Sequence, residues 1–263
     1  MNNHKTTIGQ HAAINGISMY YEIHGEGNMP LVLIHGGGST INTTFGRILS
    51  LLSAHGKVIA LELQAHGRTT DRNAPETFEQ DADDVAALLK HLHIEKANIL
   101  GFSNGGTTTL QLAIRHPQLV NKIIVIAGAY KRDGFLPGFF EGMQQVTINH
   151  MPAILKEEFL KLTPDETRLQ AMFEKDKARM ISFKDYSDET LKSIKAASLF
   201  IVSDKDVITV EHTQQMSLLT EGGQLAVLPG VHGGFLGAME SDLPADSKMP
   251  ELTAMLIREF LEQ

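Results

Sequence analysis

Residues 98–106 read NILGFSNGG, and this stretch decides the fold. Its first five residues form the mostly apolar run of a buried strand, and a helical pattern follows as far as residue 116. Between them, Ser103 is flanked by Gly101 and Gly105 in the G-x-S-x-G spacing of a sharp strand-to-helix turn. Such a turn forces its serine toward a positive φ angle, exposes the hydroxyl and needs small neighbours. The stretch therefore predicts a strand, a strained turn and a helix in succession.

Further short apolar runs occur on both sides of this stretch, as expected for strands that are buried on both faces. They lie at residues 31–34, 57–63, 122–126, 199–202 and 225–228. Between them are helical patterns, at residues 44–52, 78–92 and 252–261. Residues 10–14 and 17–24 are joined by Asn15-Gly16, which indicates an antiparallel hairpin at one edge. The alternation predicts the α/β class, with a mostly parallel sheet flanked by helices.

Residues 130–194 interrupt the alternation because they contain no strand pattern and have helical stretches at 154–162 and 167–180. We interpret them as a helical cap inserted into a single α/β core of residues 1–129 and 195–263. The alternative is that these are ordinary helices that cover the sheet. The segment also carries a loose group of large apolar side chains, which are Phe135, Phe139, Phe140, Met143, Met151, Met172 and Met180. They are equally compatible with the lining of an acyl pocket and with a small core of the segment itself.

The composition excludes several kinds of chemistry. The 263 residues include no cysteine, so the chain has no disulfide, thiolate nucleophile, Cys-ligated zinc or iron–sulfur cluster. The net charge of −8 disfavours binding to nucleic acid and to anionic membranes, both of which attract positive surfaces. With 42% hydrophobic and 21% charged residues, the chain has the composition of a soluble globular protein. The length is compatible with one large domain.

The sequence contains no membrane signal. No apolar run approaches the ~20 residues that a spanning helix needs. The first ten residues are polar and lack the apolar run of a secretory signal peptide, so we expect a cytoplasmic protein. A chain from which a signal peptide had been removed would have the same composition. The sequence does not indicate an oligomeric state.

A second glycine motif, HGGG at residues 35–38, follows the first buried strand. An acyl-transfer enzyme needs two backbone N–H donors for the oxyanion of its tetrahedral intermediate. Asn104, which follows Ser103, would supply one of them, and the HGGG loop would supply the other. We assign the second donor to Gly37, with Gly36 less favoured. A phosphate-binding loop is disfavoured because the G-x-G-x-x-G spacing is absent, whereas a plain flexible loop remains the alternative.

A serine nucleophile needs a base, and the base needs a carboxylate that orients it. The chain offers Asp204 and Asp206 at the end of one buried strand and then His232 in a glycine-flanked loop after the next. Both groups lie at carboxyl ends of strands, where open α/β sheets place their sites. We assign Asp206, in preference to Asp204, as the carboxylate and His232 as the base for Ser103. The alternatives are a solvated pair of acids and a surface histidine. We interpret His35 as a hydrogen-bonded residue that shapes its loop.

These motifs resemble the α/β-hydrolase fold family, in its branch of small cap-bearing serine esterases and haloperoxidase-like hydrolases. Residues 61–69, LELQAHGRT, are similar to the D-x-x-G-H-G-x-S segment of that family, and residues 115–120, RHPQLV, to its R-H-P-x-x-V run. The G-x-x-D-x-x-x-P segment of the family falls on residues 203–210 and places the acid of the triad on Asp206. The resemblance covers most of the chain.

The chain also departs from the family pattern. Ser203 replaces the glycine and Val210 the proline of the acid segment, so this loop is expected to differ in shape. Gly38 stands where relatives that cleave an N-terminal proline carry a proline, which disfavours that activity. Ser103 disfavours the relatives with an aspartate nucleophile, the epoxide hydrolases and haloalkane dehalogenases.

The resemblance implies a carboxylesterase that cleaves an ester of a small molecule through an acyl-enzyme intermediate, with no cofactor and no metal. The same triad would also serve a hydrolase of a C–C bond, lactone, thioester or amide, or a cofactor-free perhydrolase. A ligand-binding protein without activity is a further alternative, disfavoured because all three positions of the triad are filled. His91 and His93 lack nearby partners for a metal site, so we interpret them as a helix end.

Overall fold

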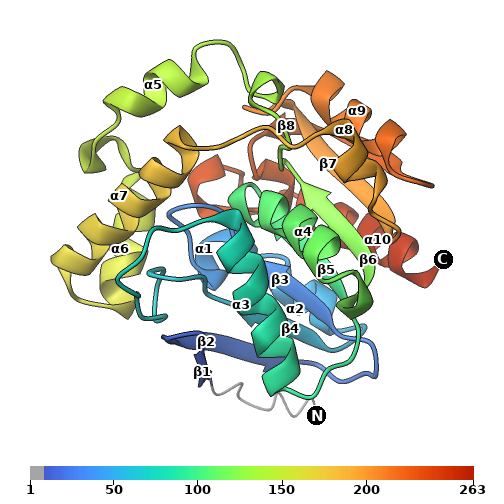
Figure 1. Cartoon of the computed structure of the whole chain (residues 1–263), viewed down its shortest axis with the longest axis horizontal. Coiled ribbons are helices and arrows are strands. Elements are labelled where there is room, and N and C mark those ends of the chain that lie inside the picture. The colour runs from blue at the N-terminus through green and yellow to red at the C-terminus, as the bar shows by residue number, and fades with distance from the viewer. Residues whose placement is uncertain (1–8) are drawn as a thin grey trace.

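The computed structural model describes residues 9–263, and the first eight residues of the polar N-terminal stretch lie outside the described part. Its centre is an eight-stranded sheet in the order β1-β2-β4-β3-β5-β6-β7-β8 (Figure 1). The strands are β1 (Gln10–Ile14), β2 (Ile17–His24), β3 (Leu31–Ile34), β4 (Val58–Leu61), β5 (Ala97–Phe102), β6 (Val120–Ile126), β7 (Ala197–Lys205) and β8 (Gln224–Val231). β2 runs antiparallel to β1 and β4, and the other neighbours are parallel. The predicted mostly parallel sheet is confirmed.

The central strands form where the sequence is continuously apolar. All residues of β3, β4 and β5 are buried, as expected for strands covered on both faces. Leu33 in β3 aligns with Ala60 on one side and Leu100 on the other. The predicted hairpin joins β1 to β2, with Asn15 and Gly16 both at positive φ, the backbone that a tight two-residue turn needs.

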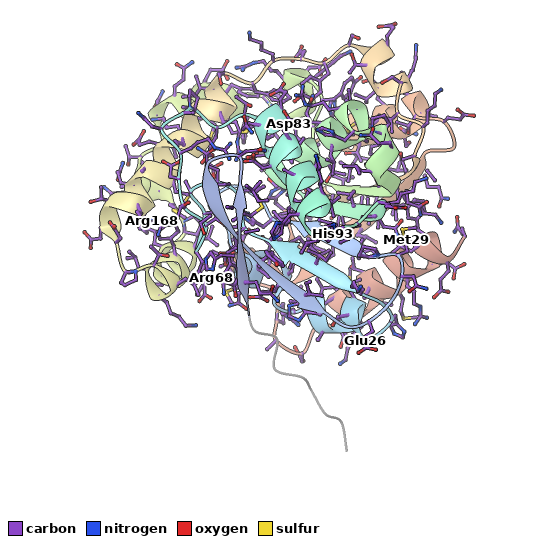
Figure 2. All side chains as sticks on the ribbon, turned by 60° about the horizontal axis from the view of Figure 1, so that its bottom comes forward. Glu26, Met29, Arg68, Asp83, His93 and Arg168 are labelled. Atoms are coloured by element: carbon purple, nitrogen blue, oxygen red, sulfur yellow. The ribbon has the colours of Figure 1, made fainter. Side chains whose placement is uncertain are left out.

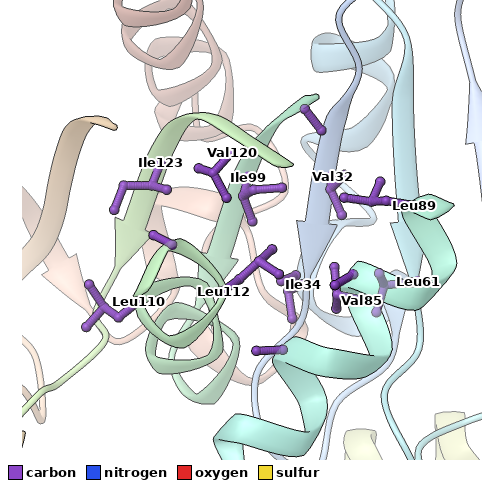
Figure 3. Packing of buried hydrophobic residues seen from close by; sticks show 14 of the residues in the cluster. Val32, Ile34, Leu61, Val85, Leu89, Ile99, Leu110, Leu112, Val120 and Ile123 are labelled. Atoms are coloured by element: carbon purple, nitrogen blue, oxygen red, sulfur yellow. The ribbon is translucent and has the colours of Figure 1, made fainter. Parts of the chain in front are cut away.

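Two layers of helices cover the sheet. The helices of the two layers are α1 (Ile41–Phe45), α2 (Leu49–Ser53), α3 (Phe78–His91), α4 (Asn104–Arg115), α9 (Val210–Leu219) and α10 (Met249–Glu262). Figure 3 shows one layer, in which Leu89 of α3 lies beside Val32 and Val85 lies beside Ile34, with α4 next to α3. α9 contributes to the same core, whereas α1, α2 and α10 pack in the core on the opposite face. The carboxyl ends of the parallel strands are therefore held by a rigid frame.

One expected helix differs from the structure. The helical pattern at 44–52 is divided into the short helices α1 and α2. Thr40 caps α1 by accepting a hydrogen bond from the Thr43 N–H at 3.3 Å, so the helix starts earlier than expected. α1 ends before Gly46, and the break lets Phe45 and Ile48 both reach the core, where each is fully buried. Side-chain periodicity alone does not show such a break.

The chain between β6 and β7, residues 127–196, is called the β6–β7 segment here. It contains α5 (Phe139–Gln145), α6 (Ala153–Leu162), α7 (Glu166–Ile181) and α8 (Asp188–Lys192). In Figure 1, α5, α6 and α7 lie to one side of the sheet, whereas α8 lies near α9. Among the described residues the segment holds no strand, and its only ladder contact is the isolated bridge between Phe135 and Ile208. No helix within residues 9–263 is both long enough and apolar enough to cross a membrane.

Hydrogen bonds attach α6 and α7 to the loop that follows β4. Arg168 donates a hydrogen bond to the Thr69 carbonyl oxygen at 2.7 Å, and Thr163 donates one to the Gly67 carbonyl oxygen at 2.8 Å. Figure 2 shows Arg168 on the same side of the molecule as Arg68, which lies in the loop after β4. The β6–β7 segment is therefore anchored, at α6 and α7, to the loop after β4.

The packing of β5 generates a stability prediction. Ile99 is fully buried in the centre of the sheet, so Ile99→Ala removes buried methyl and methylene groups and leaves a cavity. We expect the free energy of unfolding to fall by about 2–5 kcal/mol in urea titrations. Leu218→Ala is the control, because this side chain is 79% exposed and its loss should change stability by less than about 0.5 kcal/mol. Equal effects of the two substitutions would contradict this account of the core.

Candidate active site

The turn after β5 has the strained geometry expected from its sequence. Ser103 has φ 55° and ψ −120° and directly precedes α4. A Cβ atom on Gly101 would lie 2.0 Å from the Gly105 carbonyl oxygen, and one on Gly105 would lie 2.2 Å from the Ile34 carbonyl oxygen. Only glycine fits at either position. The turn is also held by the Ser103 N–H, which donates to the Ile126 carbonyl oxygen at 2.8 Å.

The structure brings together the three side chains that the sequence predicted as a triad. His232 Nε2 lies 3.0 Å from Ser103 Oγ, and His232 Nδ1 lies 2.6 Å from Asp206 Oδ1. Asp206 follows β7, and His232 follows β8. The Asp206 carboxylate also accepts hydrogen bonds from the N–H groups of Ile208 at 3.3 Å and Ser203 at 3.4 Å. Burial would raise the pKa of Asp206, but its hydrogen bond and attraction to His232 outweigh burial and hold the pKa below the ordinary value.

The alternative acid, Asp204, is engaged elsewhere. Its carboxylate is exposed and accepts a hydrogen bond from the Gly230 N–H at 2.7 Å. Ser203, which replaces the family glycine, donates from its hydroxyl to the Val231 carbonyl oxygen at 2.7 Å. Ser203 lies three residues before Asp206, and Val231 directly precedes His232. The serine that departs from the family pattern therefore links the two loops that carry the acid and the histidine.

The glycine loop after β3 lies beside the same serine. Gly37 and Gly38 line a cavity together with Ser103 and Asn104, whereas Gly36 does not. In the described part of the chain, neither the Gly37 N–H nor the Asn104 N–H has a hydrogen-bond acceptor. These two amides are therefore available to a ligand in the cavity, and their role as oxyanion donors remains a prediction.

The buried side chain of His35 holds this loop through hydrogen bonds. Its Nδ1 lies 2.7 Å from the Gly36 carbonyl oxygen, and its Nε2 accepts a hydrogen bond from the Leu63 N–H at 3.0 Å. Burial, reinforced by the nearby positive charge of His66, lowers the pKa of His35 to about 3. The imidazole is therefore neutral and structural, with Nδ1 as its donor.

The cavity at Ser103 has a volume of about 350 Å³ and a mostly apolar wall. The β6–β7 segment supplies much of that wall through Phe135, Phe139, Met143, Val146, Met151, Leu155, Met172, Phe173 and Met180. Both interpretations of the Phe and Met residues apply, because Phe140 and Met180 also pack with Phe78 and Phe183 in a small separate core. Within residues 9–263, no group of three or more His, Asp or Glu side chains is placed to hold a metal ion.

Comparison with known proteins assigns the fold. A family model described as the alpha/beta hydrolase fold matches residues 29–201. The chain belongs to the α/β-hydrolase family. A solved α/β hydrolase, the meta-cleavage product hydrolase CumD from Pseudomonas fluorescens IP01, superposes with a TM-score of 0.76 and 20% identity. That match covers 96% of this chain and 98% of CumD.

Two curated relatives match over shorter stretches. The dihydrolipoyllysine-residue acetyltransferase component of an acetoin cleaving system from Pseudomonas putida is 30% identical, over 85% of this chain and 59% of that protein. The human serine hydrolase BPHL is 35% identical, over 46% of this chain and 43% of its own length. The match therefore spans about half the length of these relatives.

Sequence reasoning missed a buried charged cluster between the α/β-hydrolase core and α7. Asp176 and Arg179 of α7 meet His66, Glu76 and Asp81 of the core. The helical pattern at 167–180 showed charge on one side, but it did not show that two of these charges point inward. Arg179 Nη1 lies 2.6 Å from Asp81 Oδ2, and both side chains are almost fully buried. The i, i+3 spacing of Asp176 and Arg179 was the available signal, because it places both on one face of a helix.

Burial and neighbouring charges shift the pKa values of this cluster strongly. Burial opposes the charge of His66, but the Asp176 carboxylate outweighs burial and raises the pKa of His66 to about 9. Burial also raises the pKa of Glu76 to about 8, against the attraction of Arg179 and with the repulsion of Asp176. Both Glu76 carboxylate oxygens lack a hydrogen-bond partner within the described residues. At neutral pH His66 is therefore charged, whereas Glu76 is mostly protonated.

The turn generates a prediction about Gly101. Gly101→Ala drives a Cβ atom into the backbone of α4, so we expect the free energy of unfolding to fall by about 3 kcal/mol or more in urea titrations. Gly56→Ala is the matched control, because a Cβ atom there meets no atom within 4 Å. If Gly101→Ala is as stable as Gly56→Ala, the close approach of β5 and α4 is not what holds the turn.

The charged cluster generates a prediction about pH. The folded chain binds the Glu76 proton more tightly than the unfolded chain does, because the pKa rises from the ordinary 4.5 to about 8. The stability from this group is complete below pH 4.5, falls as the pH rises and is lost once the pH passes about 8. Melting temperatures from pH 5 to 9 should therefore fall more steeply for the wild type than for Glu76→Gln.

The control for this pH series is Glu166→Gln, which removes an exposed carboxyl group from the first turn of α7. Its melting temperatures should run parallel to those of the wild type. Parallel curves for Glu76→Gln as well would show that Glu76 does not hold its proton in the folded chain.

Proposed function

We propose that the chain is a serine hydrolase that cleaves carboxylic esters of small, largely apolar molecules through an acyl-enzyme intermediate. The observation that carries the proposal is the hydrogen-bonded series Ser103–His232–Asp206 at the wall of an apolar cavity. Two unengaged backbone amides, those of Gly37 and Asn104, lie in the same wall. The human relative is named a serine hydrolase, which agrees with this chemistry.

Each residue has a defined role in the proposed reaction. Ser103 Oγ attacks the ester carbonyl carbon while His232 Nε2 takes the hydroxyl proton. Asp206 holds the imidazole in the correct tautomer and stabilises its charged form. The N–H groups of Gly37 and Asn104 donate to the oxyanion. The C–O bond to the alcohol then breaks, and His232 gives its proton to the leaving alkoxide.

The second half of the reaction releases the acid. A water molecule gives a proton to His232 and attacks the acyl carbon bound to Ser103. The same amides stabilise the second oxyanion, the bond to Ser103 Oγ breaks, and the proton returns from His232 to the serine. The products are one alcohol and one carboxylic acid, and the enzyme is restored.

Within this proposal, residues 130–194 act as a helical cap on a core of residues 1–129 and 195–263. The support is that α5, α6, α7 and the loops beside them supply much of the apolar wall of the cavity at Ser103. A wall of Phe and Met side chains favours apolar acyl or alcohol groups, because their burial contributes roughly 25 cal/mol per Å². The cavity, at about 350 Å³, limits the substrate to a small molecule.

Replacement of the nucleophile tests the proposal. Ser103→Ala removes the attacking oxygen, so we expect kcat on p-nitrophenyl acetate, butyrate and octanoate to fall by about 10⁴-fold or more. Ser193→Ala, at an exposed position on the surface, should leave kcat unchanged. Wild-type turnover by Ser103→Ala would refute the assignment.

Two further measurements separate the alternative reactions. Labelling of the wild type by a fluorophosphonate probe is expected, and a folded but unlabelled protein would indicate a binding role. A panel of lactones, thioesters and amides should be turned over more slowly than the esters. Faster turnover of one of those classes would replace the ester in the proposal while leaving the nucleophile in place.

A further inference from the structure

A carboxylate from the β6–β7 segment reaches the glycine loop beside the proposed oxyanion site. Asp176 Oδ2 accepts a hydrogen bond from the Gly38 N–H at 2.5 Å and lies 2.9 Å from His66 Nε2. Asp176 Oδ1 accepts from Arg179 Nη2 and, at 3.4 Å, from Asn104 Nδ2. One side chain of α7 thus contacts both segments whose backbone amides would bind the oxyanion.

The position of this carboxylate defines what it can do. Its two oxygens already face four donors, so little capacity remains for a substrate. An uncompensated negative charge here would also oppose an oxyanion on the neighbouring amides. Arg179 and the charged His66 supply the compensation, because both contact the same carboxylate. Asp176 lines the cavity, but its oxygens are already engaged and its charge is balanced by Arg179 and His66, so we assign it no direct role in binding the substrate.

The glycine loop is built around this contact. Gly38 has φ 65°, the left-handed region that glycine adopts most readily. A Cβ atom on Gly37 would lie 2.5 Å from Asn104 Nδ2 and 3.1 Å from Asp176 Oδ2, so a larger residue there would displace the Asn104 side-chain amide and crowd the Asp176 carboxylate. Within the described residues, the Gly38 N–H lies against Asp176 Oδ2 and, at 3.2 Å, His66 Nε2, whereas the Gly37 N–H directly before it has no acceptor.

We propose that Asp176 is a positioning residue that fastens the glycine loop to α7 and thereby sets the direction of the Gly37 N–H. The contact also makes formation of the oxyanion site depend on the docking of α7 onto the core. The inference rests on the proposed function, since it assigns a residue that supports the oxyanion site of that reaction. Asp176 acts through Gly38 and Gly37 and does not touch the reacting atoms.

Asp176→Asn tests the proposal because it keeps the shape of the side chain and removes its charge. The single amide oxygen can accept either from the Gly38 N–H and His66 or from Arg179 and Asn104, and the amide N–H₂ group then faces the other pair of donors, so the side chain can no longer satisfy all four contacts. With p-nitrophenyl butyrate, we expect kcat to fall between about tenfold and 10²-fold, with KM changed less than about threefold. The rate of labelling by a fluorophosphonate should fall in parallel, because its phosphoryl oxygen uses the same amides.

Asp71→Asn is the matched control. Asp71 forms a different ion pair with α7, at 2.6 Å to Lys175, and it does not contact the glycine loop. Both substitutions therefore remove one charged contact between α7 and the core. We expect Asp71→Asn to keep the wild-type kcat and labelling rate, even where its melting temperature falls. If Asp176→Asn only lowers the melting temperature, as the control does, or if its kcat rises, the positioning role is overturned.

A second variant keeps the test decisive if Asp176→Asn does not fold. His66→Gln retains a donor toward Asp176 but removes one of the two compensating charges, and kcat should fall by about threefold to tenfold at unchanged KM. An unchanged kcat would contradict the proposal. Failure of the proposed function has a different signature, which is labelling of the wild type without turnover of any ester; the comparison of labelling rates then still tests Asp176. A folded wild type that is neither labelled nor active would overturn both.

Discussion

The left-handed backbone at Ser103 is the constraint on which the rest of this structure depends. At φ 55° the chain turns from β5 into α4 within one residue, and glycines at 101 and 105 make room for that turn. The turn lifts the hydroxyl off the end of the sheet toward the loops after β7 and β8. It also points the first amide of α4 at the same place, where the positive end of the helix favours negative charge. One strained residue thus places both the proposed nucleophile and a proposed oxyanion donor.

A second constraint is that the charges buried between α7 and the core must nearly cancel. Arg179, almost fully buried, faces the carboxylates of Asp81, Asp176 and, at 3.8 Å, Glu76. Such a group is stable only if the charges nearly cancel, because an unpaired charge in a low-dielectric interior is very costly. The high pKa values of His66 and Glu76 achieve this at neutral pH by adding one positive charge and removing one negative charge. The docking of α7 is thereby linked to the protonation of core residues.

These two constraints meet at the glycine loop after β3. From the core side, the loop is held by the neutral His35 imidazole and lies against the serine turn. From the other side, it is held by the Asp176 carboxylate of α7. Gly36, Gly37 and Gly38 have no side chains and little rigidity of their own, so their geometry is set by the hydrogen bonds of the Gly36 carbonyl and the Gly38 N–H. Under the proposed function, the stability of the fold and the reaction therefore depend on the same hydrogen bonds.

The sequence by itself determined the sheet, the turn and the three residues of the proposed triad. Buried strands, glycine punctuation and the order Ser103, Asp206, His232 are local patterns, and each follows from the conformation that a short stretch can adopt. The division of the helix at 44–52 and the inward direction of Asp176 and Arg179 were decided only by the tertiary structure. A charged face looks the same in sequence whether it meets water or a buried partner, because the compensating residues, His66 and Asp81 among them, lie about 100 positions away.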